Sequence, residues 1–211
     1  MGGRTIGTSY ARWIATATEP SVLLFWLPLG AGGHVVRLNG LAFEAVDAAV
    51  HHRRRQPLFH AALEVRLEGH RHAIEQGPVW GTTDPDRGVA CEGPVGSRWL
   101  GRSRLFRYEV RCWRDGVIPD VAEAVGGPRH LGTDRTRAAH LLDLVPDVPR
   151  ATWGRDEQRA GEMWSSNSVV AWLLARSGHD VQGIAPPTGG RAPGWHAGLV
   201  VAARHDPEPT R

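Results

Sequence analysis

Residues 163–178 have the sequence MWSSNSVVAWLLARSG and predict a helix in the core of the protein. Ser and Asn are favoured at helix starts because their side-chain oxygens accept hydrogen bonds from the free backbone N–H groups there. The residues that follow are apolar on most sides, which is typical of a buried helix. Gly178 is a common residue just past a helix C-terminus. We therefore expect a core helix that begins near Ser166 with a polar first turn.

The polar start of this helix has two interpretations. Thiol and serine hydrolases often place their attacking atom at the N-terminus of a buried helix, because the helix dipole and free N–H groups favour a developing negative charge. Ser166 would then be the nucleophile. Backbone N–H groups at Ser166 and Asn167 would hold the oxyanion, with the Asn167 and Ser165 side chains in support. In the alternative interpretation, these side chains only cap a core helix.

Length and composition indicate one globular domain. The chain has 211 residues, of which 41% are hydrophobic and 22% are charged, and these values are ordinary for a globular protein. We expect a single domain over residues 1–211, with a core at about residues 22–203 and a polar tail at residues 204–211. All 25 basic residues are Arg, which we attribute to coding bias in a GC-rich genome. The formal net charge of +3 is modest.

The sequence also favours a cytoplasmic location. Two cysteines, Cys91 and Cys112, are too few for a disulfide framework and predict free thiols in a reducing compartment. Residues 1–20 lack the long apolar core of a signal peptide. Residues 21–33 are apolar, but they contain Pro28 and are shorter than the roughly 20 residues of a membrane helix. We therefore expect no transmembrane segment.

Local patterns predict an α+β fold, with a central antiparallel sheet packed against a few helices. Asn39–Gly40 lies between two apolar runs, which is a strong hairpin signal. Apolar runs, alternation and turn residues give the other elements. The expected strands lie at 22–27, 34–38, 41–46, 59–67, 70–76, within 98–113 and at 199–202, and the expected helices lie at 120–125, 133–144 and 166–176.

The register of one hairpin can be predicted. A two-residue loop at residues 68–69 pairs Leu67 with His70, and therefore Leu63 with Ile74. A slip by one residue would place Ile74 among charged side chains, so the apolar match favours this register.

The same register suggests a catalytic arrangement. It places Glu75 on the face that carries His60, one diagonal step away. A nucleophile needs a base that takes its proton, and the base needs a third group that fixes its tautomer. His60 would be the base, Glu75 the orienting acceptor and Ser166 the nucleophile. The structural alternatives are a satisfied structural His at position 60 and a surface carboxylate at position 75.

Three short pieces of the chain resemble a known family. Residues 59–65 (FHAALEV), 74–75 (IE) and 164–168 (WSSNS) are similar to the motifs of circularly permuted, papain-like NlpC-type hydrolases, the group that includes lecithin–retinol acyltransferase. In that group a His opens a strand, a polar residue follows on the next strand, and a Cys begins a helix. Ser166 stands here in the place of the Cys.

This resemblance implies a permuted papain-like fold and a hydrolase or acyltransferase that acts on an amide, ester or thioester through an acyl-Ser166 intermediate. The implied partner is a small-molecule, peptide or lipid-like acyl substrate, and no cofactor or metal is expected. A Ser hydroxyl depends on its base more than a thiol does, because Cys is partly ionised at neutral pH. The alternative is therefore a non-catalytic binding protein that keeps a papain-like cleft without the thiol.

Two other function classes are disfavoured. Residues 53–55 are the only continuous basic run, and a solvated loop explains them better than binding of nucleic acid. His70 and His72 have a spacing compatible with metal binding, but no Cys or Asp cluster joins them, so we expect structural roles. Most of the nine Trp residues should fill the core, because they are scattered through apolar runs.

Overall fold

The computed structural model describes residues 19–30, 34–81 and 84–204. Residues 1–18, which belong to the segment predicted above not to be a signal peptide, and residues 205–211 of the expected tail lie outside the described residues. The strands form one six-stranded sheet with the order β4-β5-β3-β2-β1-β6, and every neighbouring pair is antiparallel. The strands are β1 (Ser21–Pro28), β2 (Phe59–Leu67), β3 (His70–Pro78), β4 (Val89–Pro94), β5 (Arg107–Arg114) and β6 (Arg129–Gly132).

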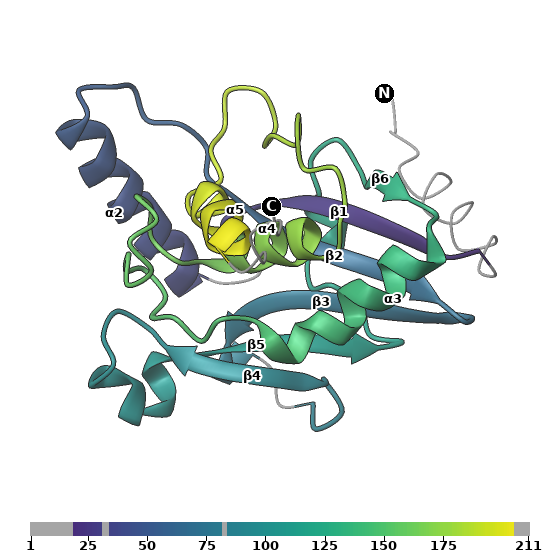
Figure 1. Ribbon diagram of the computed structural model, residues 1–211. Coiled ribbons are helices and arrows are strands. Elements are labelled where there is room, and N and C mark those ends of the chain that lie inside the picture. The colour runs from purple at the N-terminus through teal and green to yellow at the C-terminus, as the bar shows by residue number, and fades with distance from the viewer. Residues whose placement is uncertain (1–18, 31–33, 82–83, 205–211) are drawn as a thin grey trace, which may run out of the picture.

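Helices α3, α4 and α5 lie together in front of the sheet, and α2 lies at its left end (Figure 1). This arrangement confirms the expected α+β class. The helices are α2 (His34–Val50), α3 (Arg135–Leu144), α4 (Ser166–Arg176) and α5 (Trp195–Arg204). The loops of the described residues also contain five 3-10 turns: η1 (Val79–Gly81), η2 (Leu100–Arg102), η3 (Arg104–Phe106), η4 (Val121–Glu123) and η5 (Val145–Asp147).

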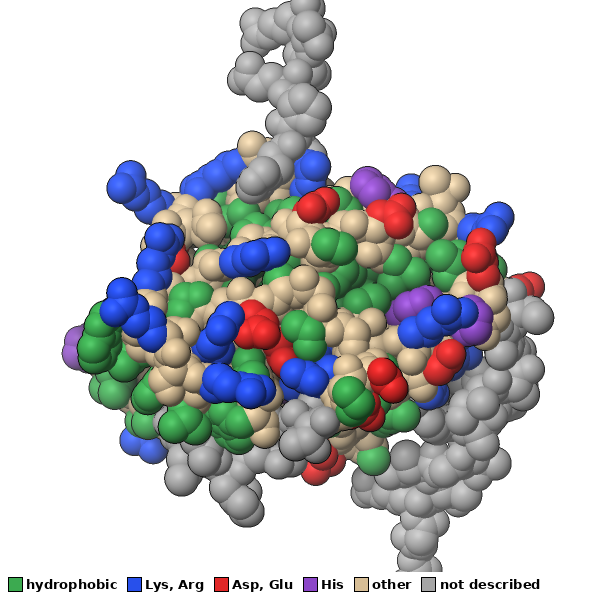
Figure 2. All heavy atoms as spheres, turned by 90° about the horizontal axis from the view of Figure 1, so that it is seen from below, with side chains coloured by type: hydrophobic (Ala, Val, Ile, Leu, Met, Phe, Trp, Pro, Cys, Tyr) green, Lys and Arg blue, Asp and Glu red, His purple; other side chains and the backbone are tan. Residues whose placement is uncertain are grey.

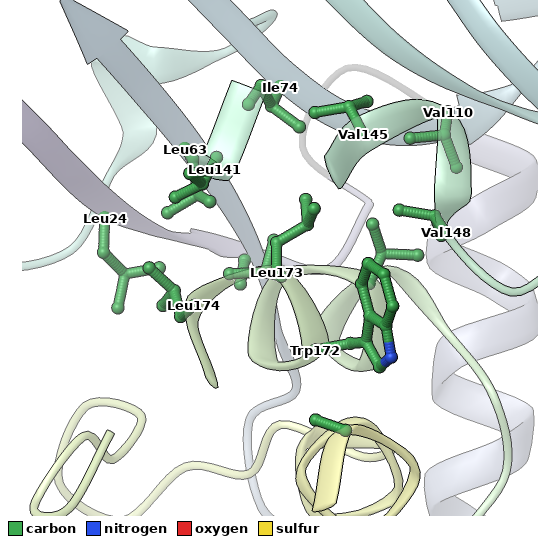
Figure 3. Close-up of a cluster of buried hydrophobic side chains, with 14 of the residues drawn as sticks. Leu24, Leu63, Ile74, Val110, Leu141, Val145, Val148, Trp172, Leu173 and Leu174 are labelled. Carbon is green, nitrogen blue, oxygen red and sulfur yellow. The ribbon is translucent and has the colours of Figure 1, made fainter. Parts of the chain in front are cut away.

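The larger core lies between the sheet and α3, α4 and α5. Strand β2 contributes Phe59, Ala61, Leu63 and Val65 to it, which is every second residue of the strand. Apolar side chains of α4 fill the space above these residues. Figure 3 shows this packing, with Leu173 of α4 among side chains of the sheet and of α3.

A second, smaller core lies on the opposite face of the sheet. Ala62 of β2 and Ala73 of β3 belong to it, and Ile118 covers them from the segment that follows β5. Three alternate residues of β1 complete it: Leu23, Phe25 and Leu27. Both faces of β2 are therefore buried, and consecutive residues of this strand point into different cores.

The predicted register of β2 and β3 is confirmed. Leu63 pairs with Ile74 and Leu67 with His70, across the turn at residues 68–69. Both residues at this turn have positive φ, as a tight hairpin turn requires. The predicted core helix at residues 166–176 is also confirmed, as is the helix near 133–144, which begins after the N-cap residue Asp134.

The predicted hairpin around Asn39–Gly40 is wrong, because one helix, α2, continues through both residues. The inward side of this helix carries Gly40, Glu44 and Ala48, which are buried and four residues apart. A Cβ at Gly40 would lie 2.5 Å from the Leu29 side chain. Gly40 therefore allows the helix to approach the end of β1 closely and does not form a turn.

The predicted strand at residues 199–202 is also wrong, because these residues belong to α5. Ala197, Gly198, Val201 and Ala202 are buried with helical spacing. A Cβ at Gly198 would lie 2.3 Å from the carbonyl oxygen of Ser168. Close packing of α5 on α4 thus depends on small residues, which the sequence pattern does not distinguish from a strand.

The remaining differences concern short elements. Within the expected strand region 98–113, only residues 107–113 are extended, since η2 and η3 precede β5. The expected helix at 120–125 is the single turn η4. Strands β4 and β6 were not predicted. Cys91 and Cys112 are free thiols, as expected. Within the described residues, no helix has the length and apolar character needed to cross a membrane.

Candidate functional site

The polar start of α4 forms a reciprocal cap. The Ser165 hydroxyl accepts a hydrogen bond from the backbone N–H of Asn167 at 3.2 Å, and the Ser168 hydroxyl accepts one from the N–H of Ser165 at 3.0 Å. Both hydroxyls also donate across to the chain that enters α5, Ser165 to the carbonyl of Pro193 at 2.8 Å and Ser168 to that of Gly194 at 2.7 Å. These two serines therefore fix the start of α5 against α4.

The carboxamide of Asn167 joins α4 to the edge of β2. Its oxygen accepts from the N–H of Ala61 at 2.8 Å, and its nitrogen donates to the carbonyls of Phe59 at 3.0 Å and Pro193 at 2.9 Å. Strand β3 pairs with residues 63–67 of β2 and not with the earlier ones. The first residues of β2 therefore have no neighbouring strand on the side of β3. The buried Asn167 side chain takes the place of a neighbouring strand there.

Ser166 differs from its neighbours in the first turn. It is the first residue of α4 and is half-buried. Within the described residues, its hydroxyl makes no hydrogen bond, whereas Ser165, Asn167 and Ser168 are all engaged. Ser166 is therefore the one polar side chain of this turn that is available to a ligand.

The structure does not bring His60 to Ser166. His60 alternates with Phe59 and Ala61, which face α4 in the larger core, so its side chain belongs to the opposite face with Ala62. Desolvation lowers the pKa of His60 to about 4, although the residue keeps some exposed surface, and no acidic group opposes this shift. His60 therefore has neither the position nor the basicity expected of a base for Ser166.

Glu75 lies on the same face as His60, as the register predicts, but it has a different partner. Its carboxylate accepts from Arg111 Nη1 at 2.7 Å, and the residue is buried. Desolvation raises the pKa of Glu75, with Arg111 opposing the shift. Glu75 is thus neither a surface carboxylate nor the orienting group of His60. The expected Ser166–His60–Glu75 triad is not assembled.

This face also carries an ionic network that was not predicted from the sequence. Arg111 also donates to Glu109 at 2.6 Å and to the carbonyl of Pro78 at 3.0 Å. Glu109 is fully buried and accepts two further hydrogen bonds from Arg87, at 2.5 and 2.9 Å. The Arg111 guanidinium lies against Gly77, where a Cβ would be in ordinary van der Waals contact with Nη1, at 3.5 Å. Alternation of charge at positions 107, 109 and 111 of β5 was the signal that could have revealed this network.

The other candidate groups have structural surroundings. His70 contacts Asp115 at 3.1 Å. Burial raises the pKa of both thiols, that of Cys112 to about 11, so neither cysteine is an activated nucleophile. In the part of the chain that the structure describes, no three His, Cys, Asp or Glu side chains gather as metal ligands.

The basic run at residues 53–55 is only partly solvated. Arg54 and Arg55 are exposed, as expected. Arg53 instead makes two hydrogen bonds to Glu44 of α2, at 2.5 and 2.9 Å. Asp47 also binds Arg53, so this basic run helps to hold α2 in place.

No family model matches this chain, and comparison with curated proteins and with solved structures finds no match either. The residues themselves therefore carry the functional argument.

The position of His60 leads to a prediction about acid stability. The unfolded chain binds a proton near the ordinary His pKa of about 6.5, whereas folded His60 stays neutral down to about pH 4. The contribution of His60 is therefore complete above pH 6.5 and is lost as the pH falls toward 4. We expect the free energy of unfolding, measured with urea, to fall more steeply over this range for the wild type than for His60→Gln. Parallel pH curves for the two proteins would show that folded His60 titrates normally.

Proposed function

We propose that this protein is a non-catalytic binding protein. The observation that carries the proposal is the orientation of β2, which turns Phe59 and Ala61 toward α4 and turns His60 to the other face of the sheet. A Ser hydroxyl is a weak nucleophile without a base that takes its proton. Because His60, the expected base, lies on the face opposite α4, the polar start of α4 is best explained as a cap.

The hydrogen bonds of α4 support the same interpretation. Ser165, Asn167 and Ser168 bind backbone groups of β2, α4 and the start of α5. They therefore serve the fold, and a role in holding an oxyanion would compete with these contacts. Proteins that bind a partner without reacting with it need no such nucleophile and can use any exposed surface.

A hydrolase or acyltransferase with Ser166 as nucleophile is the second candidate. One observation favours it: the Ser166 hydroxyl is uncommitted and lies at a helix N-terminus, where negative charge is stabilised. A permuted papain-like fold and an acyl substrate belong to this candidate. A cytoplasmic location is part of both proposals and is supported by the two free thiols.

Labelling with a fluorophosphonate separates the two candidates, because this reagent modifies activated serines. We expect the intact mass of the full-length protein to stay unchanged after incubation with the reagent, and Ser166→Ala to behave identically. An active serine hydrolase treated in parallel controls for the quality of the reagent. Labelling of the wild type that maps to Ser166, and that disappears in both Ser166→Ala and His60→Ala, would favour the hydrolase.

A further inference from the structure

One exposed surface combines apolar and basic side chains. Residues 97–107 have the sequence SRWLGRSRLFR and form η2 and η3 before β5. Trp99 and Leu105 are 71% and 69% exposed, and Phe106 is 41% exposed. Trp80 of η1, which packs against η3, is 47% exposed. We call residues 97–107 together with Trp80 the turn surface.

The charge of the turn surface has one sign. The segment contains four Arg and no Asp or Glu. Arg98 pairs with Glu157 at 3.0 Å, and Arg107 pairs with Glu92 at 2.9 Å. For Arg102 and Arg104, which are exposed, no acidic partner lies among the described residues. Two positive charges therefore remain available beside exposed apolar groups. Figure 2 shows Arg side chains beside hydrophobic ones toward the left of that view.

The turn surface projects outward and is held in shape by its own backbone. All five residues from 102 to 106 are exposed. Ser103 organises the two turns, because its N–H donates to the carbonyl of Leu100 at 2.9 Å and its own carbonyl accepts from Phe106 at 3.0 Å. A projecting surface cannot enclose a small ligand, but its side chains can insert into an extended, deformable surface such as a lipid bilayer.

We infer that the turn surface docks the protein onto an anionic membrane. This inference rests on the proposed binding function, because it names the membrane as the partner that is bound. Trp side chains prefer the membrane interface, and exposed Leu and Phe side chains partition into the boundary of the acyl chains. Arg102 and Arg104 would lie among acidic headgroups. Single-stranded nucleic acid fits less well, because bases stack on aromatic faces and use a groove, which leaves Leu105 without a role.

Sedimentation with lipid vesicles tests this inference. We expect the full-length protein to sediment with vesicles of phosphatidylcholine and phosphatidylglycerol in equal parts, and much less with phosphatidylcholine alone. Arg102→Gln combined with Arg104→Gln should lower the partition coefficient by about 25-fold, since each Arg near an anionic surface contributes roughly fivefold. Trp99→Ser combined with Leu105→Ser should also lower it, because the inserted apolar groups are lost.

A matched control is available in Arg54→Gln combined with Arg55→Gln, which changes the net charge equally at another exposed site. This control should bind as the wild type does. Equal losses in both Arg variants, equal binding to both kinds of vesicle, or no vesicle binding would each overturn the inference. So would binding of poly-uridylate that depends on Arg102 and Arg104 without any vesicle binding. Circular dichroism confirms folding of each variant, and serine labelling reports separately on the proposed lack of catalysis.

Discussion

Asn167→Ala should lower the free energy of unfolding by about 3–5 kcal/mol, because it leaves two buried backbone groups without partners, at about 1–3 kcal/mol each. The groups are the N–H of Ala61 and the carbonyl of Phe59, whereas the carbonyl of Pro193 keeps its hydrogen bond from Ser165. The Asn167 side chain also donates to Pro193, so it connects β2, α4 and the start of α5, which are far apart in the sequence. Urea denaturation followed by circular dichroism measures the loss.

Two variants at the same turn make this prediction specific. Ser166→Ala should change the free energy of unfolding by less than about 0.5 kcal/mol, since its hydroxyl makes no hydrogen bond within the described residues. Asn167→Asp keeps an acceptor for Ala61 but cannot donate to either carbonyl, so it should also be strongly destabilising. A loss below about 1 kcal/mol for Asn167→Ala would mean that water replaces the carboxamide at these groups.

Local signals in the sequence were sufficient where a single pattern governed the structure. The β2–β3 register followed from matching Leu63 with Ile74, because a slip would bury charges. The start of α4 followed from its Ser and Asn caps. Helix α2 could not be predicted in this way, because Asn39–Gly40 has the local pattern of a hairpin turn, whereas Gly40 serves a close approach to Leu29 that local sequence does not reveal.

The predicted Ser166–His60–Glu75 triad was wrong because the position of α4 was not predicted. The register correctly placed His60 and Glu75 on one face, but it did not say which face α4 covers. Alternation usually answers that question, because one face of a strand is polar. In β2, the apolar Phe59, Leu63 and Val65 alternate with His60 and Glu64, so this pattern already indicated that α4 covers the face opposite His60. The hydrogen-bond partners of Asn167 are backbone groups. Every residue has a backbone carbonyl, so residue types could not identify these partners.

The ionic network on the second face carries the other large expected effect. Arg111→Met should lower the free energy of unfolding by about 3–5 kcal/mol at pH 7, because removing one partner of a buried ion pair leaves the other uncompensated. Glu109 keeps Arg87, whereas Arg111 is the cation that binds Glu75 among the described residues. Arg114→Met on the same strand is the control. Its side chain is exposed, and it should change stability by less than about 0.5 kcal/mol.

The pH dependence of this loss distinguishes lost charge pairing from lost packing. Burial raises the pKa of Glu75 even with Arg111 present, and its removal should raise that pKa further. The folded variant then binds a proton that the unfolded chain, with an ordinary Glu pKa of about 4.3, does not hold at neutral pH. Its stability relative to wild type should therefore improve as the pH falls from 7 toward 5. Adding Glu75→Gln should recover part of the loss at pH 7 and remove this pH dependence. If the loss were equal at both pH values and Glu75→Gln recovered nothing, packing of the Arg111 side chain, and not its charge, would hold β3 and β5 together on this face.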